Sequence, residues 1–212
     1  MNEYINNAQS NQYLKDLKNF KEFLKEYKFN QLEILENDDG FLICDGEIVK
    51  DNNGYRGESE KWVNVGYTLS GTFPKLLSNL FHYEFNFKNL KLNSIECFFQ
   101  GIKFKDVEMQ RELAKYSGKE ALVLKDTSDY NWKETGIVFW DGKPVKRNSK
   151  EYEELTIELY ICAIQNKFYR NALKNCKLPI IHAIGESDKT KTVFTRYEFE
   201  YMLNALREFL NK

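Results

Sequence analysis

The stretch LLSNLFHYEFNFKNLKLNSIECFFQGIKFKD, residues 76–106, carries the strongest indication of fold in the 212-residue chain. From about Asn93 onward, large apolar residues fall within about a third of the circumference of a helix. These residues are Ile95, Phe98, Phe99, Ile102, Met109 and Leu113. The pattern predicts an amphipathic helical segment that begins near Asn93 and buries this face.

Further helices are expected on both sides of this stretch. Apolar residues recur at helical spacing over residues 11–27, with lysines and acids between them. A long helix is expected over residues 151–169. The last helix of the chain has a defined start, because Thr195 and Glu198 have the spacing of a capping box.

Two segments predict β-hairpins, namely FLIC-DG-EIVK at residues 41–50 and IVFW-DG-KPVK at residues 137–146. In both, an Asp-Gly pair supplies the two turn residues that tolerate positive φ. A short buried strand is expected in LPIIHAI, residues 178–184, and another strand in KWVNVGYTL, residues 61–69.

Together these elements predict an α+β fold, a mainly helical single domain with small β-hairpins. Residues 1–40 are expected to form an N-terminal helical extension that packs on the core. Residues 41–212 are expected to form the main domain.

Composition excludes several classes of protein. The chain has 31 basic and 32 acidic residues, a balance that argues against a general binder of duplex DNA. Its apolar runs are shorter than the roughly 18 residues of a membrane span, and its start lacks the layout of a signal peptide. Four scattered cysteines without a CxxC pair and only two histidines predict reduced thiols, no metal centre and no cofactor. We therefore expect a cytoplasmic protein without a membrane partner.

One face of the helix near Asn93 carries residues suited to chemistry. Glu96, Gln100 and Lys103 stand at positions i, i+4 and i+7, which places them within roughly 60° of one another. A carboxylate, an amide and an ammonium beside an apolar surface can bind a polar ligand and support acid–base catalysis.

A structural explanation competes with this one. Asn93 or Ser94 is a natural helix N-cap, and Asn93 with Glu96 has the spacing of a capping box. Glu96, Gln100 and Lys103 would then be ordinary neighbours on a solvated helix face.

The order of residues around this face matches a known signature. The matching residues are Leu77-Ser78-Asn79, then Phe85 and Phe87, and then Ser94-x-Glu96-x-x-x-Gln100-x-x-Lys103-Phe104. Further matches are Lys167-Phe168 with Asn171, and Asp188 after a buried strand. In these residues the chain resembles the NADAR/YbiA-like family of N-glycosidases over roughly residues 41–212. The resemblance implies the α+β fold of that family.

The resemblance also implies an activity, the cleavage of a ribosyl C–N bond. One branch of the family acts on phosphoribosyl intermediates of riboflavin synthesis, and another removes ADP-ribose from guanine bases. The expected partner is therefore a nucleotide-sugar substrate with an ADP-ribosyl or phosphoribosyl group, either free or attached to nucleic acid.

Roles follow for particular residues. Glu96 would stabilise the ribosyl cation or activate water, and Lys103 would be a proton donor or an amine that attacks the ring-opened sugar. Asp188 would assist at the rim of the site as a third catalytic residue. The substrate-binding residues implied are Ser78, Asn79, Ser94, Gln100, Phe104 and Tyr152.

The chain departs from the family pattern at two places. Tyr152 stands where the family has a tryptophan after an acid. Asp188 is followed by Lys189-Thr190-Lys191-Thr192, whereas the family continues to a Trp-Gly pair. Phe194 or Tyr197 could replace the missing stacking contact.

Two other functions remain open. The missing Trp-Gly pair favours a non-catalytic module that binds ADP-ribose or an NAD derivative, whereas Glu96 with Lys103 favours catalysis. A scaffold that uses its N-terminal helix to bind a protein is the third hypothesis. His182 lies in an apolar strand, so we interpret it as a core histidine in preference to a catalytic base.

Overall fold

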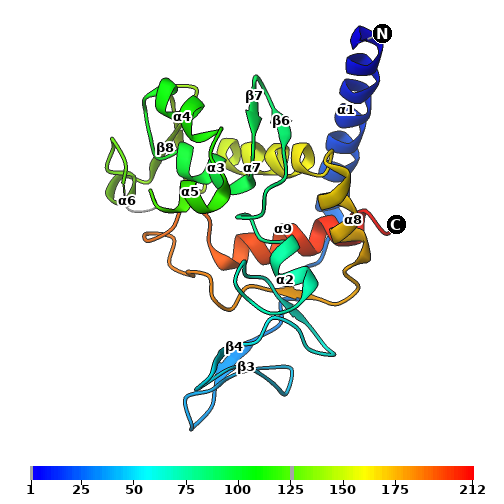
Figure 1. Ribbon diagram of the computed structural model, residues 1–212, viewed down its shortest axis with the longest axis vertical. Helices are drawn as coiled ribbons and strands as arrows, with labels where there is room; N and C mark the ends of the chain where they lie inside the picture. The colour runs from blue at the N-terminus through cyan, green and yellow to red at the C-terminus, as the bar shows by residue number, and fades with distance from the viewer. Residues whose placement is uncertain (1, 125–126) are drawn as a thin grey trace.

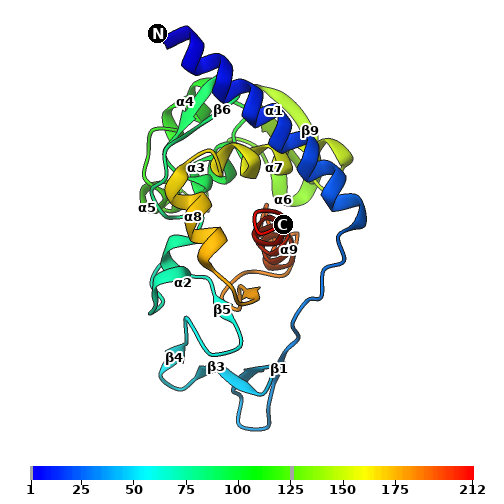
Figure 2. The same cartoon turned by 90° about the vertical axis from the view of Figure 1, so that its right-hand side faces the viewer.

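A computed structural model describes residues 2–124 and 127–212, with side chains from residue 11 onward. Two long helices, α7 (Lys150–Ala163) and α9 (Arg196–Phe209), run through the middle of the molecule (Figures 1 and 2). Helix α7 contacts α1, α3, β6 and β9, and helix α9 contacts α1, α8 and β10. Leu159, Tyr160 and Leu203 on these two helices are completely buried. The fold is α+β, which confirms the class predicted from the sequence.

The strands form several small sheets. One antiparallel sheet has the order β1-β2-β3-β4, two hairpins pair β6 with β7 and β8 with β9, and β5 pairs in parallel with β10. The strand bounds are β1 Ile34–Glu36, β2 Leu42–Cys44, β3 Glu47–Asp51, β4 Gly54–Tyr55, β5 Val63–Asn64, β6 Phe85–Phe87, β7 Leu90–Leu92, β8 Ile137–Trp140, β9 Lys143–Lys146 and β10 Ile180–Ile181. The short helices are α2 Thr72–Leu76, α5 Gly118–Leu122 and α6 Trp132–Thr135.

Both predicted hairpins are confirmed, because strands β2–β3 and β8–β9 flank the two Asp-Gly turns. Asp45 and Gly46 have φ of 50° and 77°, and Asp141 and Gly142 have φ of 50° and 72°. These left-handed values at both central residues are what a two-residue hairpin turn requires.

Helix α1 (Asn2–Glu26) packs across α7 and α9, and an extended segment then runs down to β1 (Figure 2). Phe20 on α1 is completely buried, and its ring centroid lies 5.2 Å from that of Phe209. The boundary near residue 40 stays a prediction, although β1 on one side of it is paired with β2 on the other.

Two segments predicted as continuous helices are each divided in two. The segment that begins near Asn93 forms α3 (Ile95–Gly101) and α4 (Val107–Leu113), and Asp106 caps α4 by accepting a hydrogen bond from the Glu108 amide. The segment 151–169 forms α7 and α8 (Lys167–Asn175), and Asn166 caps α8 in the same way. Apolar periodicity continues across each break because both halves pack on one core.

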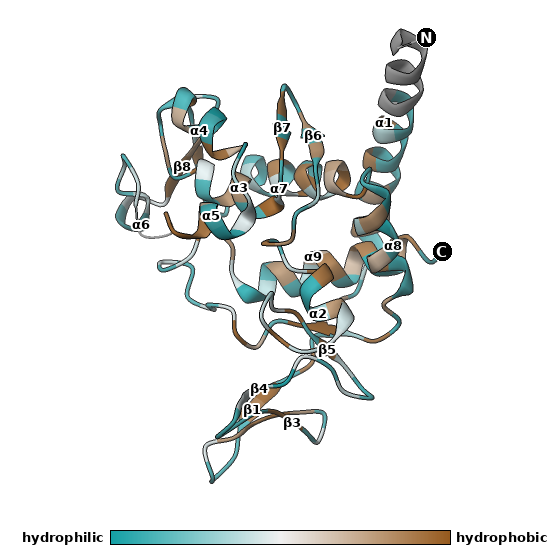
Figure 3. Cartoon of the chain, in the orientation of Figure 1, coloured by the Kyte–Doolittle hydropathy of each residue, from teal (hydrophilic) through white to brown (hydrophobic). Residues whose placement is uncertain are grey.

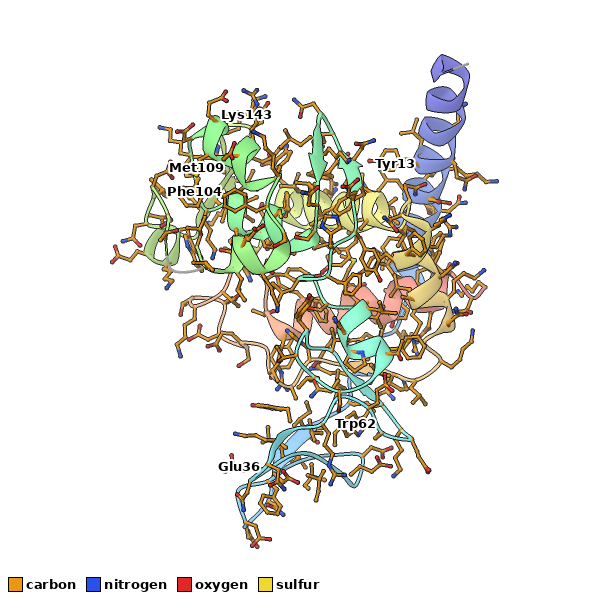
Figure 4. All side chains as sticks on the ribbon, in the orientation of Figure 1. Tyr13, Glu36, Trp62, Phe104, Met109 and Lys143 are labelled. Carbon is orange, nitrogen blue, oxygen red and sulfur yellow. The ribbon has the colours of Figure 1, made fainter. Side chains whose placement is uncertain are left out.

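A second, smaller core joins the β1–β4 sheet to the rest of the molecule. Trp62 is completely buried there and donates from Nε1 to the carbonyl oxygen of Cys44 at 3.2 Å (Figure 4). Ile181 and Ala183 belong to the same cluster. The cluster therefore holds the chain on both sides of residue 182.

The predicted capping box at the start of α9 is confirmed. The Thr195 hydroxyl accepts from the Glu198 amide at 3.3 Å, and the Glu198 carboxylate accepts from the Thr195 amide at 2.7 Å. Helix α9 is amphipathic, with hydrophilic and hydrophobic residues along its length (Figure 3).

Thr195→Ala should lower the free energy of unfolding by about 1 kcal/mol, because it leaves the Glu198 amide in the first turn of α9 without its side-chain acceptor. Thr195→Ser keeps the hydroxyl and should retain most of the stability. Urea denaturation of both variants tests this. Equal stability of the alanine variant and the parent would show that the cap contributes nothing.

Within the described part of the chain, the helices are too short or too polar to cross a lipid bilayer.

Candidate functional site

A cleft of about 480 Å³ lies between three parts of the chain. One wall is the link between α2 and β6, which includes Ser78 and Asn79. The floor is α3 and the residues that follow it. The opposite wall comes from the segment between β10 and α9, which includes His182 and Phe194.

The three residues predicted to share a helix face all line this cleft. The Lys103 ammonium donates to Oε1 of Gln100 at 2.7 Å, and the Gln100 amide nitrogen donates to Oε1 of Glu96 at 2.5 Å. Gln100 and Lys103 are each only 4% exposed. A solvated helix face is therefore excluded, and the hydrogen bonds fix the orientation of the Glu96 carboxyl.

The capping alternative for Glu96 is also excluded. Ser94 is the N-cap of α3, and its hydroxyl accepts from the Cys97 amide at 3.3 Å. Asn93 instead donates its side-chain amide to the carbonyl oxygen of Lys115 at 2.6 Å. The Glu96 side chain thus has no part in the cap and points to the chain of hydrogen bonds in the cleft.

Burial raises the pKa of the Glu96 carboxyl, against the opposing effects of the Gln100 hydrogen bond and the Lys103 charge. A carboxyl with a raised pKa can exchange a proton closer to neutral pH than an exposed one. Glu96 is thus suited to acid or base catalysis.

Asn79 is held by hydrogen bonds to residues of α3 and α7. Its carbonyl oxygen accepts from the Glu96 amide at 3.0 Å, and its Oδ1 accepts from the Tyr160 hydroxyl at 2.9 Å. Burial raises the pKa of Tyr160, so its hydroxyl stays protonated as the donor. Since Oδ1 is engaged, the amide nitrogen is the group of Asn79 suited to meet a ligand.

Aromatic rings form part of the lining. Phe99 and Phe194 stack with centroids 4.5 Å apart and planes at 21°, and both line the cleft. Phe194 was one of the two residues named to replace the missing tryptophan. The other, Tyr197, lies outside the lining and is 43% exposed.

Four of the predicted site residues do not reach the cleft. Ser94 is completely buried as a helix cap, and Phe104 is 7% exposed and lies outside the lining. Tyr152 is behind the wall, where its hydroxyl donates to the carbonyl oxygen of Val193. Asp188 accepts from the Thr190 amide and hydroxyl at 2.8 and 2.7 Å, and these bonds lower its pKa. Asp188 therefore stabilises its own turn at the surface.

The wall between β10 and α9 is hard to predict from sequence. His182 has the hydrogen-bonded ring expected of a core histidine, with Nδ1 2.7 Å from the Val65 carbonyl oxygen, and it also lines the cleft together with Gly185 and Glu186. The available signal was a polar residue directly after a buried strand, a position where chains often place functional groups.

The described residues contain no group of three or more His, Cys, Asp or Glu side chains arranged to hold a metal ion. Cys44, Cys97, Cys162 and Cys176 are buried free thiols.

Comparison with known proteins identifies the family. The family described as bacteriophage protein GP30.3 matches residues 72–208. A relative from Enterobacteria phage T4, described as an uncharacterized 17.1 kDa protein in the Gp30-rIII intergenic region, is 36% identical over 137 residues. The match covers 63% of this chain and 90% of that protein. No solved structure matches the chain.

These matches correct the family suggested by the sequence. The NADAR/YbiA-like resemblance rests on scattered residues between Leu77 and Asp188, with its densest block at Ser94–Phe104, and the matches above assign the chain to a different family. Within that block Ser94 is explained by its role as the cap of α3 and Phe104 by its burial. The matched region runs from the start of α2 into α9, and it leaves out α1 and the β1–β4 sheet. This chain belongs to the bacteriophage protein GP30.3 family.

Proposed function

We propose that the cleft hydrolyses the ribosyl C–N bond of an ADP-ribosyl or phosphoribosyl compound, such as ADP-ribosylated guanine or a riboflavin-pathway intermediate. The observation that carries the proposal is the buried chain of hydrogen bonds from Lys103 through Gln100 to Glu96. It places a carboxyl of raised pKa and an ammonium in one cleft that also has an aromatic lining.

The reaction passes through a sugar with oxocarbenium character. The ionised Glu96 carboxylate stabilises that cation or takes a proton from the attacking water. Lys103 supplies a proton to the departing base, or its amine attacks the ring-opened sugar. Gln100 is occupied in orienting Glu96, so Asn79 is better suited than Gln100 to bind a ribose hydroxyl.

The alternative is a module that binds ADP-ribose or an NAD derivative without turnover. The position of Asp188 favours this alternative, because Asp188 lies outside the cleft. Of the two carboxylates predicted to be catalytic, Glu96 is then the one that lines the cleft. Binding without turnover needs only the aromatic lining and the polar wall.

Incubation with candidate substrates distinguishes the two functions. ADP-ribosylated guanosine in DNA, NAD, ADP-ribose and a phosphoribosyl intermediate of riboflavin synthesis are each mixed with the purified protein, and mass spectrometry follows release of the base. We expect one of these compounds to be cleaved at its C–N bond. Binding of a compound that remains intact would support the alternative and contradict the glycosidase.

We also propose a cytoplasmic location, because the four buried cysteines are free thiols of the kind that reducing compartments maintain.

A further inference from the structure

His182 has a fixed environment on the wall of the cleft opposite α3. Its Nδ1 lies 2.7 Å from the carbonyl oxygen of Val65, and its ring centroid lies 4.5 Å from that of Phe199. The backbone on either side is also held, because the His182 amide donates to Glu200 Oε1 at 2.8 Å and the Ala183 amide donates to Asn64 Oδ1 at 2.9 Å.

These contacts determine which nitrogen carries the proton. A carbonyl oxygen only accepts hydrogen bonds, so Nδ1 must be the protonated nitrogen. Burial lowers the pKa of His182 to about 4, against the opposing effect of the Val65 hydrogen bond, and the nearby Arg196 charge adds to the lowering. The ring is therefore neutral near pH 7, and its Nε2 carries a lone pair.

Gly185 packs beside the Cδ2–Nε2 edge of the ring, where a side chain would collide with it. A Cβ at this position would lie 2.3 Å from His182 Cδ2, 2.8 Å from its Nε2 and 2.8 Å from Arg196 Cβ. The backbone of Gly185 approaches the ring this closely because it has no side chain. Both His182 and Gly185 line the cleft.

We propose that His182 is a ligand-reading residue, a pre-oriented neutral acceptor whose Nε2 receives a hydrogen bond from an O–H or N–H group of the bound compound. The identity of that compound rests on the proposed function in its ADP-ribosyl form, in which ADP-ribose is the product or ligand. Its groups with the required chemistry are the hydroxyls of its two riboses and the exocyclic amine of adenine. A site built around a buried acceptor rejects an analogue that lacks the matching donor.

Nitrogen NMR tests the acceptor directly on the unaltered protein. The chain has two histidines, so selective ¹⁵N-histidine labelling gives two imidazoles, and the exposed His82 serves as the internal reference. We expect one ring to be neutral with Nδ1 protonated at pH 7. Saturating ADP-ribose should shift its Nε2 resonance while Nδ1 stays protonated. A ring protonated on Nε2, or an Nε2 resonance unchanged by bound ADP-ribose, would overturn the proposal.

Calorimetry then identifies the donor. The protein is titrated with ADP-ribose, with IDP-ribose, which lacks the adenine amine, and with analogues that each lack one hydroxyl of the terminal ribose or of the adenosine ribose. One of these analogues should bind about tenfold more weakly than ADP-ribose. In His182→Phe, which keeps a ring against Phe199 but removes the acceptor, that difference should disappear. His82→Phe is the matched control and should preserve it.

The possible results separate this proposal from the glycosidase. Discrimination that depends on His182, without any hydrolysis, would sustain the acceptor and reject the enzyme. Hydrolysis with equal binding of all analogues, or with discrimination that survives in His182→Phe, would reject the acceptor and sustain the enzyme. If ADP-ribose and its analogues fail to bind the wild-type protein, the proposal is wrong. Because the NMR experiment uses wild-type protein, it decides the matter even if His182→Phe fails to fold.

Discussion

Glu96→Gln should reduce turnover about a hundredfold or more while the variant still binds its ligand. The amide has nearly the same shape as the carboxyl, and its oxygen can still accept from the Gln100 amide nitrogen, now 2.5 Å from Glu96 Oε1. It lacks the negative charge that stabilises a ribosyl cation, and loss of one such electrostatic contribution commonly costs about a hundredfold in rate. Single-turnover rates and calorimetric affinities measured side by side check both halves of this expectation.

The same variant has a predictable effect on stability. Burial raises the pKa of Glu96 in the folded chain above that in the unfolded chain, so the folded state binds the proton more tightly. Stability is then lost as the pH rises from the unfolded pKa, roughly 4.3, through the folded pKa. At pH 7 Glu96→Gln should be at least as stable as wild type, and the difference should vanish below about pH 4. A variant that is both inactive and less stable at pH 7 would indicate a structural role.

Turnover near the wild-type rate in Glu96→Gln would defeat the catalytic assignment. The rates of Glu96→Gln and wild type can be compared without a contribution from helix capping, because Ser94 caps α3 and Glu96 does not. A silent substitution could then no longer be explained by glutamine serving as well as glutamate in a capping box.

The parts of the fold that sequence predicted are those set by local geometry. The two Asp-Gly turns and the Thr195 cap depend on residues within a few positions of one another, so their patterns are visible in the chain. The helices that begin after Asp106 and Asn166 are also capped by these local residues. The caps are not evident from the sequence, because the apolar periodicity continues through both positions. The pairing of β5 with β10 joins residues more than a hundred positions apart, and no local pattern encodes it.

The candidate site also has one part that is set by local geometry and one that is set by long-range folding. Glu96, Gln100 and Lys103 share a face by helical spacing alone, so one side of the cleft was predictable. The opposite wall depends on how the segment after β10 folds back over α3, which brings His182 and Phe194 to the cleft. Asp188 does not reach the cleft because the Thr190 amide and hydroxyl in its own turn donate to its carboxylate. The order of residues does not reveal that this local hydrogen bonding competes with a position in the cleft.

Lys103→Met should also reduce turnover about a hundredfold, for a different reason. Methionine fills similar space, but it removes the ammonium that donates to Gln100 at 2.7 Å and could protonate the leaving base. The chain offers a matched control in Lys133. Both ammonium groups lie over the ring of Trp132, at 5.7 and 5.9 Å from its centroid, yet only Lys103 lines the cleft. Lys133→Met should therefore turn over substrate at nearly the wild-type rate.

Borohydride trapping distinguishes the two roles of Lys103. If its amine attacks C1 of the ring-opened sugar, the C–N bond to the base breaks, the base leaves with a proton and an imine forms. In turnover water hydrolyses this imine, whereas hydride reduces it to a stable secondary amine. Mass spectrometry would then find the sugar attached to Lys103 in wild type and in Lys133→Met, but not in Lys103→Met. If Lys103 only donates a proton, no adduct forms although turnover still depends on it. Full activity in Lys103→Met would exclude both roles, and Glu96 would then have to act with water alone.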